Sequence, residues 1–194
     1  MAQTNQEVVD AATWIFVAVL PSQAAETLGA LKFEARHRVV SLMAGVALGD
    51  VASFLGHHVP ESSVVQAIPL PPVAHQQGVT VVHPAAPQVV AWFNLLGTCV
   101  PVATAAQMKV VPTVTCLMGT YYAFLQTAHR WLVAKGVDSA AASTYVGALL
   151  HSIAADGKGV GGAGFEALIA EQTPGGYNEQ VAVQGPVAQP SPAL

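Results

Sequence analysis

A long uncharged run in the second half of the chain is the feature that most constrains its fold. No residue between Lys109 and Arg130 carries a formal charge, and apolar or small side chains occupy nearly every face of the helix that this run would form. A helix that is apolar all round must be buried on all sides or lie in lipid. We therefore expect residues 110–134 to form a helix at the centre of an oligomer interface, in a homodimer or a larger homo-oligomer.

Two alternatives for this run stay open. An ordinary core helix within one subunit would also be surrounded by protein. A membrane span is disfavoured because about 18 or more consecutive apolar residues are needed, whereas Pro112 and several threonines interrupt this run. We therefore expect no membrane partner.

The composition excludes several classes of function. Charged residues make up 9% of the 194 residues and hydrophobic residues 53%, whereas about a quarter of an average domain is charged. A partner subunit would cover the excess apolar surface. The net charge of −4 comes without a basic run, so no nucleic-acid partner is expected. Cys99 and Cys116 lie in apolar settings and predict reduced thiols of a cytoplasmic protein, and no signal peptide is visible.

Apolar runs alternate with helical periodicity over the first hundred residues. Helices are expected at 5–12, 21–31, 48–55 and 87–96, and strands at 12–20, 38–44, 63–68, 78–83 and 98–102. This alternation predicts βαβ units and a mostly parallel sheet. After Ala103 the pattern is helical only, with a second helix at 138–155 capped by Asp138 and a third at 164–171. The sequence therefore predicts an α/β part over 1–103, an all-α part over 104–184 and a disordered tail over 185–194.

An α/β part followed by an apolar helical part resembles the pyrroline-5-carboxylate reductase family, and short segments match that family's motifs in the same order. Each match is weak alone, and their order makes the resemblance specific. The matching segments are 4–9 (TNQEVV) for S-N-x-x-V, 18–21 (AVLP) for A-V-K-P, 42–48 for A-A-G-V-x-L, 65–78 before G-V-T-V, 116–124 in place of S-G-S-G-P-A-Y, and 173–176 (TPGG) for S/T-P-G-G.

The resemblance implies an incomplete Rossmann-like, partial dinucleotide-binding domain over 1–103 and a helical dimerisation and substrate domain over 104–184. It also implies an oxidoreductase that uses NADPH to reduce a small imine to L-proline, the last step of proline biosynthesis. The cofactor-binding residues would be Asn5 on the adenosine side, Ala18, Val19 and Pro21 at the nicotinamide end, and Pro69 in the adjacent wall.

The resemblance places the substrate carboxylate at the loop formed by Thr173, Pro174, Gly175 and Gly176. Two glycines before a helix leave backbone N–H groups unobstructed, which suits a carboxylate. Each of these segments also has a plain structural interpretation, since residues 173–176 can be a helix-capping turn and residues 18–21 a strand end.

Several departures from the family bear on activity. No strand with a G-x-G-x-x-G turn precedes the first expected strand, so NADPH binding is expected to be weakened. Leu20 stands where the motif has lysine, and Cys116 and Met118 replace two serines. The alternative function is a non-catalytic dimerisation remnant of the family. The seven histidines form no metal-binding pattern, and no catalytic residue is assigned, because in such reductases the cofactor carries the hydride chemistry.

Overall fold

The computed structural model describes residues 4–56 and 58–184. The chain folds into two compact units, residues 1–116 and 117–194. The boundary after residue 103 stays a prediction, and the expected disordered tail at 185–194 lies outside the described residues.

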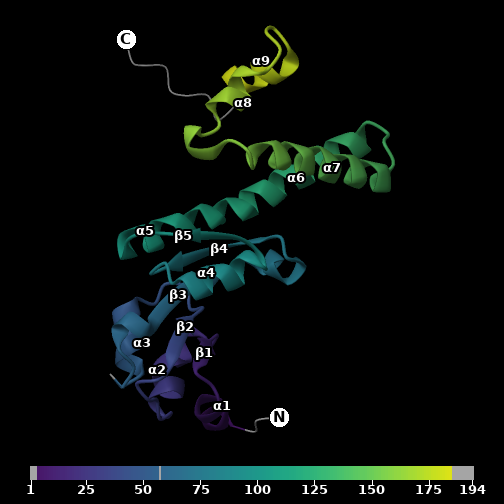
Figure 1. Cartoon of the computed structure of the whole chain (residues 1–194). Coiled ribbons are helices and arrows are strands. Elements are labelled where there is room, and N and C mark those ends of the chain that lie inside the picture. Colours follow the sequence, from purple (N-terminus) through teal and green to yellow (C-terminus); the bar gives the residue numbers. More distant parts are fainter. Residues whose placement is uncertain (1–3, 57, 185–194) are drawn as a thin grey trace, which may run out of the picture. The chain divides into compact units, whose positions relative to one another are not determined.

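The first unit is built on a five-stranded sheet with the strand order β1-β2-β3-β4-β5 (Figure 1). The pairs β1–β2, β2–β3 and β4–β5 are parallel, and β3–β4 is antiparallel. The predicted α/β class with a mostly parallel sheet is thus confirmed. The strands are β1 (Trp14–Val17), β2 (Arg38–Ser41), β3 (Val64–Pro69), β4 (Gly78–His83) and β5 (Gly97–Pro101).

Helices and 3-10 turns connect these strands. Pro21 and Pro87 each stand at a helix start, where the missing N–H costs nothing. Thr104 caps α5 through a reciprocal pair of hydrogen bonds with Gln107. The helices of this unit are α1 (Asn5–Ala11), α2 (Pro21–Gly29), α3 (Leu48–Phe54), α4 (Pro87–Asn94) and α5 (Ala105–Val110), with 3-10 turns η1 (Glu61–Ser63), η2 (Pro71–His75) and η3 (Val111–Cys116).

Helices cover both faces of the sheet, as the neighbouring residues Val39 and Val40 of β2 show. Both are 0% exposed although they point to opposite faces. Val39 belongs to the core cluster beneath α1, α2 and α3, and Val40 to the cluster beneath α4. Strands buried on both faces need apolar residues at every position, which explains the continuous apolar runs in the sequence.

The second unit is helical and contains α6 (Leu117–Ala134), α7 (Ser139–Gly157), η4 (Gly161–Ala163), α8 (Glu166–Ala170) and α9 (Tyr177–Gln184). The carboxylate of Asp138 accepts hydrogen bonds from the first N–H groups of α7, as its predicted capping role requires. The single helix expected at 110–134 is divided, because α5 ends at Val110 and η3 precedes α6. Pro112 accounts for the break, since it has no N–H to continue the helical ladder. None of the helices in the described ranges has the length and apolar character that a bilayer crossing requires.

Candidate functional site

One face of the sheet carries a polar pair between two helices. In the antiparallel β3–β4 pair Gln66 lies opposite His83, and Ile68 lies opposite Val81. Directly opposite residues have their side chains on the same face. Met108 of α5 packs against Ile68 and Val81. The cluster under α3 lies on this face too, because it contains the β3 residue two positions before Gln66.

A cavity of about 330 Å³ lies between these two helices. Its floor is the polar pair, and one wall is the turn that follows β2, at residues 44–48. Ligands of open α/β sheets bind beyond the carboxyl ends of strands, and this turn is the carboxyl end of β2. The cavity is lined by Ala44, Gly45, Val46, Ala47, Leu48, Gln66, Ile68, His83, Ala105, Met108, Lys109 and Pro112.

Gln66 fixes the wall of this cavity. The residue is 8% exposed, and Nε2 donates hydrogen bonds to the carbonyls of Met43 (3.1 Å) and Val46 (2.8 Å). Both neighbours are acceptors, so the amide has only one possible orientation. Its Oε1 accepts no hydrogen bond from the described residues. Gly45 adopts φ +79°, which suits glycine in such a turn.

His83 and Lys109 supply the other polar groups of the cavity. Nδ1 of His83 lies 3.0 Å from the Val102 carbonyl; since a carbonyl only accepts, Nδ1 carries the proton and Nε2 of a neutral ring keeps a lone pair. Lys109 makes no ion pair within the described part of the chain. The cavity therefore offers an amide oxygen, an imidazole nitrogen and an ammonium group among apolar walls.

The sequence reasoning missed these three residues. In the sequence, Lys109 marks only one end of the uncharged run, and His83 is only one of seven histidines that form no metal-binding pattern. Gln66 was not singled out, although a glutamine inside the otherwise apolar strand VVQAIP is a usable signal. A polar residue in a strand buried on both faces needs a partner or a ligand.

The predicted cofactor residues lie at element ends. Asn5 begins α1, Ala18 and Val19 follow β1, Pro21 begins α2, and Pro69 ends β3. Because β1, β2 and β3 are parallel, the segments after β1 and β3 lie at the same sheet edge as the turn after β2. None of the five lines the 330 Å³ cavity. Their cofactor role stays a prediction.

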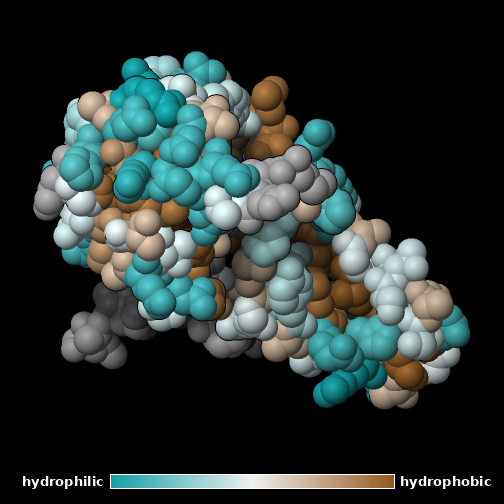
Figure 2. All heavy atoms as spheres, turned by 90° about the horizontal axis from the view of Figure 1, so that it is seen from below, coloured by the Kyte–Doolittle hydropathy of each residue, from teal (hydrophilic) through white to brown (hydrophobic). Residues whose placement is uncertain are grey.

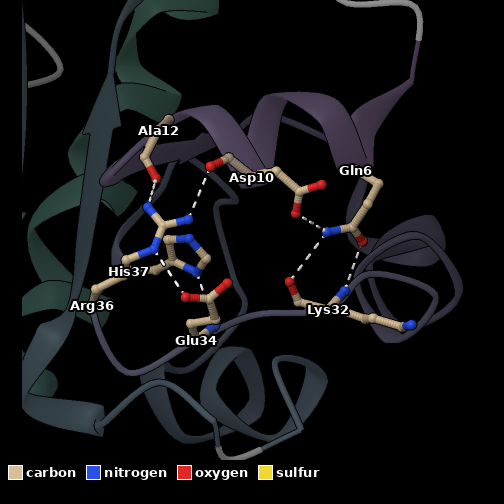
Figure 3. A network of polar contacts seen from close by, with 7 residues as sticks. All are labelled: Gln6, Asp10, Ala12, Lys32, Glu34, Arg36 and His37. Atoms are coloured by element: carbon tan, nitrogen blue, oxygen red, sulfur yellow. Dashed lines mark hydrogen bonds and ion pairs between the residues drawn. The ribbon is translucent and has the colours of Figure 1, made fainter.

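A polar network holds the helix that begins with Asn5 (Figure 3). The Arg36 guanidinium donates to the carbonyls of Asp10 (2.9 Å) and Ala12 (2.8 Å) at the end of α1. The Gln6 amide exchanges hydrogen bonds with the backbone of Lys32. α1 is thereby fixed to the segment between α2 and β2.

The Thr173–Gly176 segment forms a closed turn before α9. The Gly175 N–H donates to Oε2 of Glu179 (2.6 Å), and the Gly176 N–H donates to the Thr173 carbonyl (2.8 Å). Gly175 adopts φ +72°, and a Cβ on Gly176 would lie 2.8 Å from the Thr173 oxygen, so both positions require glycine. Both N–H groups expected to meet a substrate carboxylate are engaged within the loop. The substrate role of Thr173, Pro174, Gly175 and Gly176 stays a prediction.

A G-x-G-x-x-G spacing does occur, at Gly159, Gly161 and Gly164. It lies between α7 and α8 and contains η4. A dinucleotide turn needs a strand before it and a helix directly after it, so this spacing does not provide one. No group of three metal-ligating side chains occurs in the ranges 4–56 and 58–184.

The second unit exposes an unusual amount of apolar surface. None of the α6 residues is buried, and an apolar groove of about 490 Å³ lies between α6 and α7. Figure 2 shows hydrophobic side chains (brown) exposed among hydrophilic ones on the face that it draws. The large exposed side chains of this unit include Leu117, Tyr122, Phe124, Trp131, Tyr145, Leu149, Ile153, Phe165 and Ile169.

Comparison with known proteins gives matches among solved structures. No family model and no curated protein matches the chain. A 1-pyrroline-5-carboxylate reductase from Streptococcus pyogenes is 18% identical with a TM-score of 0.74, over 95% of this chain and 73% of that one. The NADP-bound pyrroline carboxylate reductase from Plasmodium falciparum is 18% identical with a TM-score of 0.74, over 92% and 70%. A reductive aminase from Aspergillus terreus in complex with NADPH is 18% identical with a TM-score of 0.54, over 88% and 61%.

These matches show the fold of the chain. The chain has an incomplete Rossmann-like α/β unit followed by a helical unit. More particularly, it has the fold of pyrroline-5-carboxylate reductases, which confirms the resemblance inferred from the sequence at the level of the fold.

Proposed function

We propose that this chain is an NADPH-dependent oxidoreductase that reduces the C=N bond of a small imine, with pyrroline-5-carboxylate as substrate and L-proline as product. The cavity at the carboxyl end of β2 carries the proposal. It combines Gln66, His83 and Lys109 in a fold shared with reductases whose structures contain NADP or NADPH.

The residues of the chain would bind and orient the reactants. NADPH would supply a hydride when bound, and the C=N π electrons of the protonated imine would become the nitrogen lone pair of the amine product. The free Oε1 of Gln66, a residue that lines the cavity, can accept a hydrogen bond from a ligand that donates an N–H. Asn5, the Ala18–Pro21 segment and Pro69 would bind the cofactor, as the resemblance implies. Ile68 and Met108 would exclude water from the reacting atoms.

The test is oxidation of NADPH by the purified chain with pyrroline-5-carboxylate, followed by loss of its near-ultraviolet absorbance. We expect substrate-dependent oxidation and formation of proline. Absence of oxidation with this and other cyclic imines, together with no heat of NADPH binding in calorimetry, would exclude the reductase. That result would favour the second candidate, a non-catalytic dimerisation remnant, which the internally engaged N–H groups of Gly175 and Gly176 support.

We also propose a homodimer or larger homo-oligomer held by α6 and α7. Phe124 and Trp131 are each 61% exposed and Tyr145 is 62% exposed within one chain. A surface of this kind marks an interaction site, and an uncharged run is suited to pairing with its own copy. Phe124→Asp should give monomer or insoluble protein in light scattering, while Lys32→Glu in the first unit should leave the assembly unchanged. A folded monomer of the unaltered chain at micromolar concentration contradicts this proposal.

A further inference from the structure

We propose that Lys109 binds the carboxylate of the substrate and so sets the preference of this chain for acidic imines. The inference rests on the proposed function and adds a residue to it. It moves the carboxylate from the Thr173–Gly176 loop to the 330 Å³ cavity of the first unit.

Among the residues that the structure describes, Lys109 is the one lysine, arginine or carboxylate that lines this cavity. It stands in the last turn of α5, beside the buried Met108, and has no ion-pair partner in the described part of the chain. Its positive charge is therefore unbalanced within the described lining of the cavity. Lys109 is itself exposed, so solvent screens part of its attraction for an anion. An anionic ligand would bind most favourably beside Lys109, because no other residue of the described lining carries a full positive charge.

The remaining polar groups of the cavity suit the other end of such a substrate. Gln66 presents Oε1 because its amide nitrogen donates to two carbonyls at the β2 turn. His83, directly opposite, keeps Nε2 as a second acceptor when neutral. A protonated imine carries an N–H donor and a positive charge, and both favour an acceptor. Lys109 can bind the carboxylate of such a substrate, while Gln66 and His83 accept from its positively charged N–H group. This arrangement suits a small zwitterion.

The Thr173–Gly176 loop is a poorer place for a carboxylate. Oε2 of Glu179 already accepts from the Gly175 N–H at 2.6 Å, and the Thr173 carbonyl accepts from the Gly176 N–H. A substrate carboxylate would have to displace Glu179 and would be repelled by its charge. These hydrogen bonds lie in the second unit and do not involve the residues that line the cavity of the first unit.

The size of the cavity limits the substrate. Small-molecule sites span about 300–1,000 Å³, and 330 Å³ lies at the lower end of that range. The site therefore fits a single small ring with its carboxylate and disfavours bulky cyclic imines.

The experiment compares two imines on matched variants. Pyrroline-5-carboxylate carries the carboxylate and 1-pyrroline lacks it. Lys109→Met removes the charge at similar length, Lys109→Arg keeps it, and Lys32→Met removes a lysine of the same unit outside the cavity lining. An ion pair with an exposed side chain is worth up to about fivefold in affinity. We expect Lys109→Met to raise the KM for pyrroline-5-carboxylate by about two- to fivefold, with 1-pyrroline little affected, and Lys109→Arg to restore most of the loss.

A binding measurement separates this inference from the proposed function. Calorimetric titration with L-proline should show binding to the unaltered chain that weakens with added salt and with Lys109→Met, even if no imine is reduced. Equal effects of Lys109→Met on both imines, or none on either, would overturn the inference. So would carboxylate binding that depends on Glu179→Gln and not on Lys109, since that result returns the carboxylate to the loop. Absence of proline binding to the unaltered chain would overturn it as well.

Discussion

Replacement of Gln66 by leucine tests whether a single amide holds the turn after β2. Leucine has a similar volume but no donors, so the carbonyls of Met43 and Val46 lose their partner. Met43 is 2% exposed and Gln66 8% exposed, so water cannot freely replace the hydrogen bond to the Met43 carbonyl.

The expected loss in the free energy of unfolding is the cost of the two lost hydrogen bonds minus the gain from burying the leucine side chain. The buried carbonyl of Met43 would be left unpaired at a cost of about 1–3 kcal/mol. The bond to Val46 is only partly buried, and its loss costs about 0.5–1.5 kcal/mol. Burial of leucine returns about 1 kcal/mol or slightly more. We therefore expect Gln66→Leu to lower the free energy of unfolding of the first unit by about 1–3 kcal/mol.

The assay is urea unfolding followed by tryptophan fluorescence, since Trp14 and Trp92 pack against each other in this unit with ring centroids 4.7 Å apart. Gln23→Leu on the exposed side of α2 is the matched control and should change stability little. If Gln66→Leu unfolds at the same urea concentration as the parent chain, the amide does not hold the turn and the reasoning is refuted.

Three further predictions concern other positions. Thr80→Val should raise the free energy of unfolding by about 1 kcal/mol, because the threonine hydroxyl is buried without a partner in the described residues; a decrease in urea unfolding would contradict this. Arg36→Met should lower stability by about 1–2 kcal/mol in the same assay, because it removes the donors at the end of α1, and an unchanged midpoint would show that this network is dispensable. Burial raises the pKa of the Cys99 thiol, so less of this thiol is thiolate near neutral pH. Iodoacetamide should therefore modify the exposed Cys116 first, as followed by mass spectrometry. Faster labelling of Cys99 would contradict this prediction.

The strands could be predicted from local sequence, but their order could not. A strand buried on both faces needs an apolar residue at every position, and this leaves a visible run around Val39 and Val40. Pairing is long-range, so the sequence predicted only a mostly parallel sheet. The antiparallel direction of β4 could have been predicted from the sequence. The segment between β3 and β4 contains only η2 (Pro71–His75), which is too short for the crossover that a parallel pair requires.

The candidate site was less predictable because it depends on pairing and packing. Gln66 and His83 meet only through the register of an antiparallel pair, and Lys109 reaches the cavity only because Met108 packs on the same face. The engaged state of Gly175 had a local signal that was overlooked. Glu179 lies in the first turn of α9, where a carboxylate commonly reaches back to a free N–H.

The fold and the chemistry of this chain place different demands on its sequence. Core positions such as Val40 and Val82, both 0% exposed, need only an apolar side chain of suitable volume, so the fold can persist at 18% identity. Exposed positions beyond a strand end are free of this demand. Leu20 stands where the A-V-K-P motif has lysine and is 63% exposed, so packing does not explain its change, whereas a lysine does line the cavity from α5 at position 109. The charged side chains of this chain can therefore change position without disturbing the core that defines its fold.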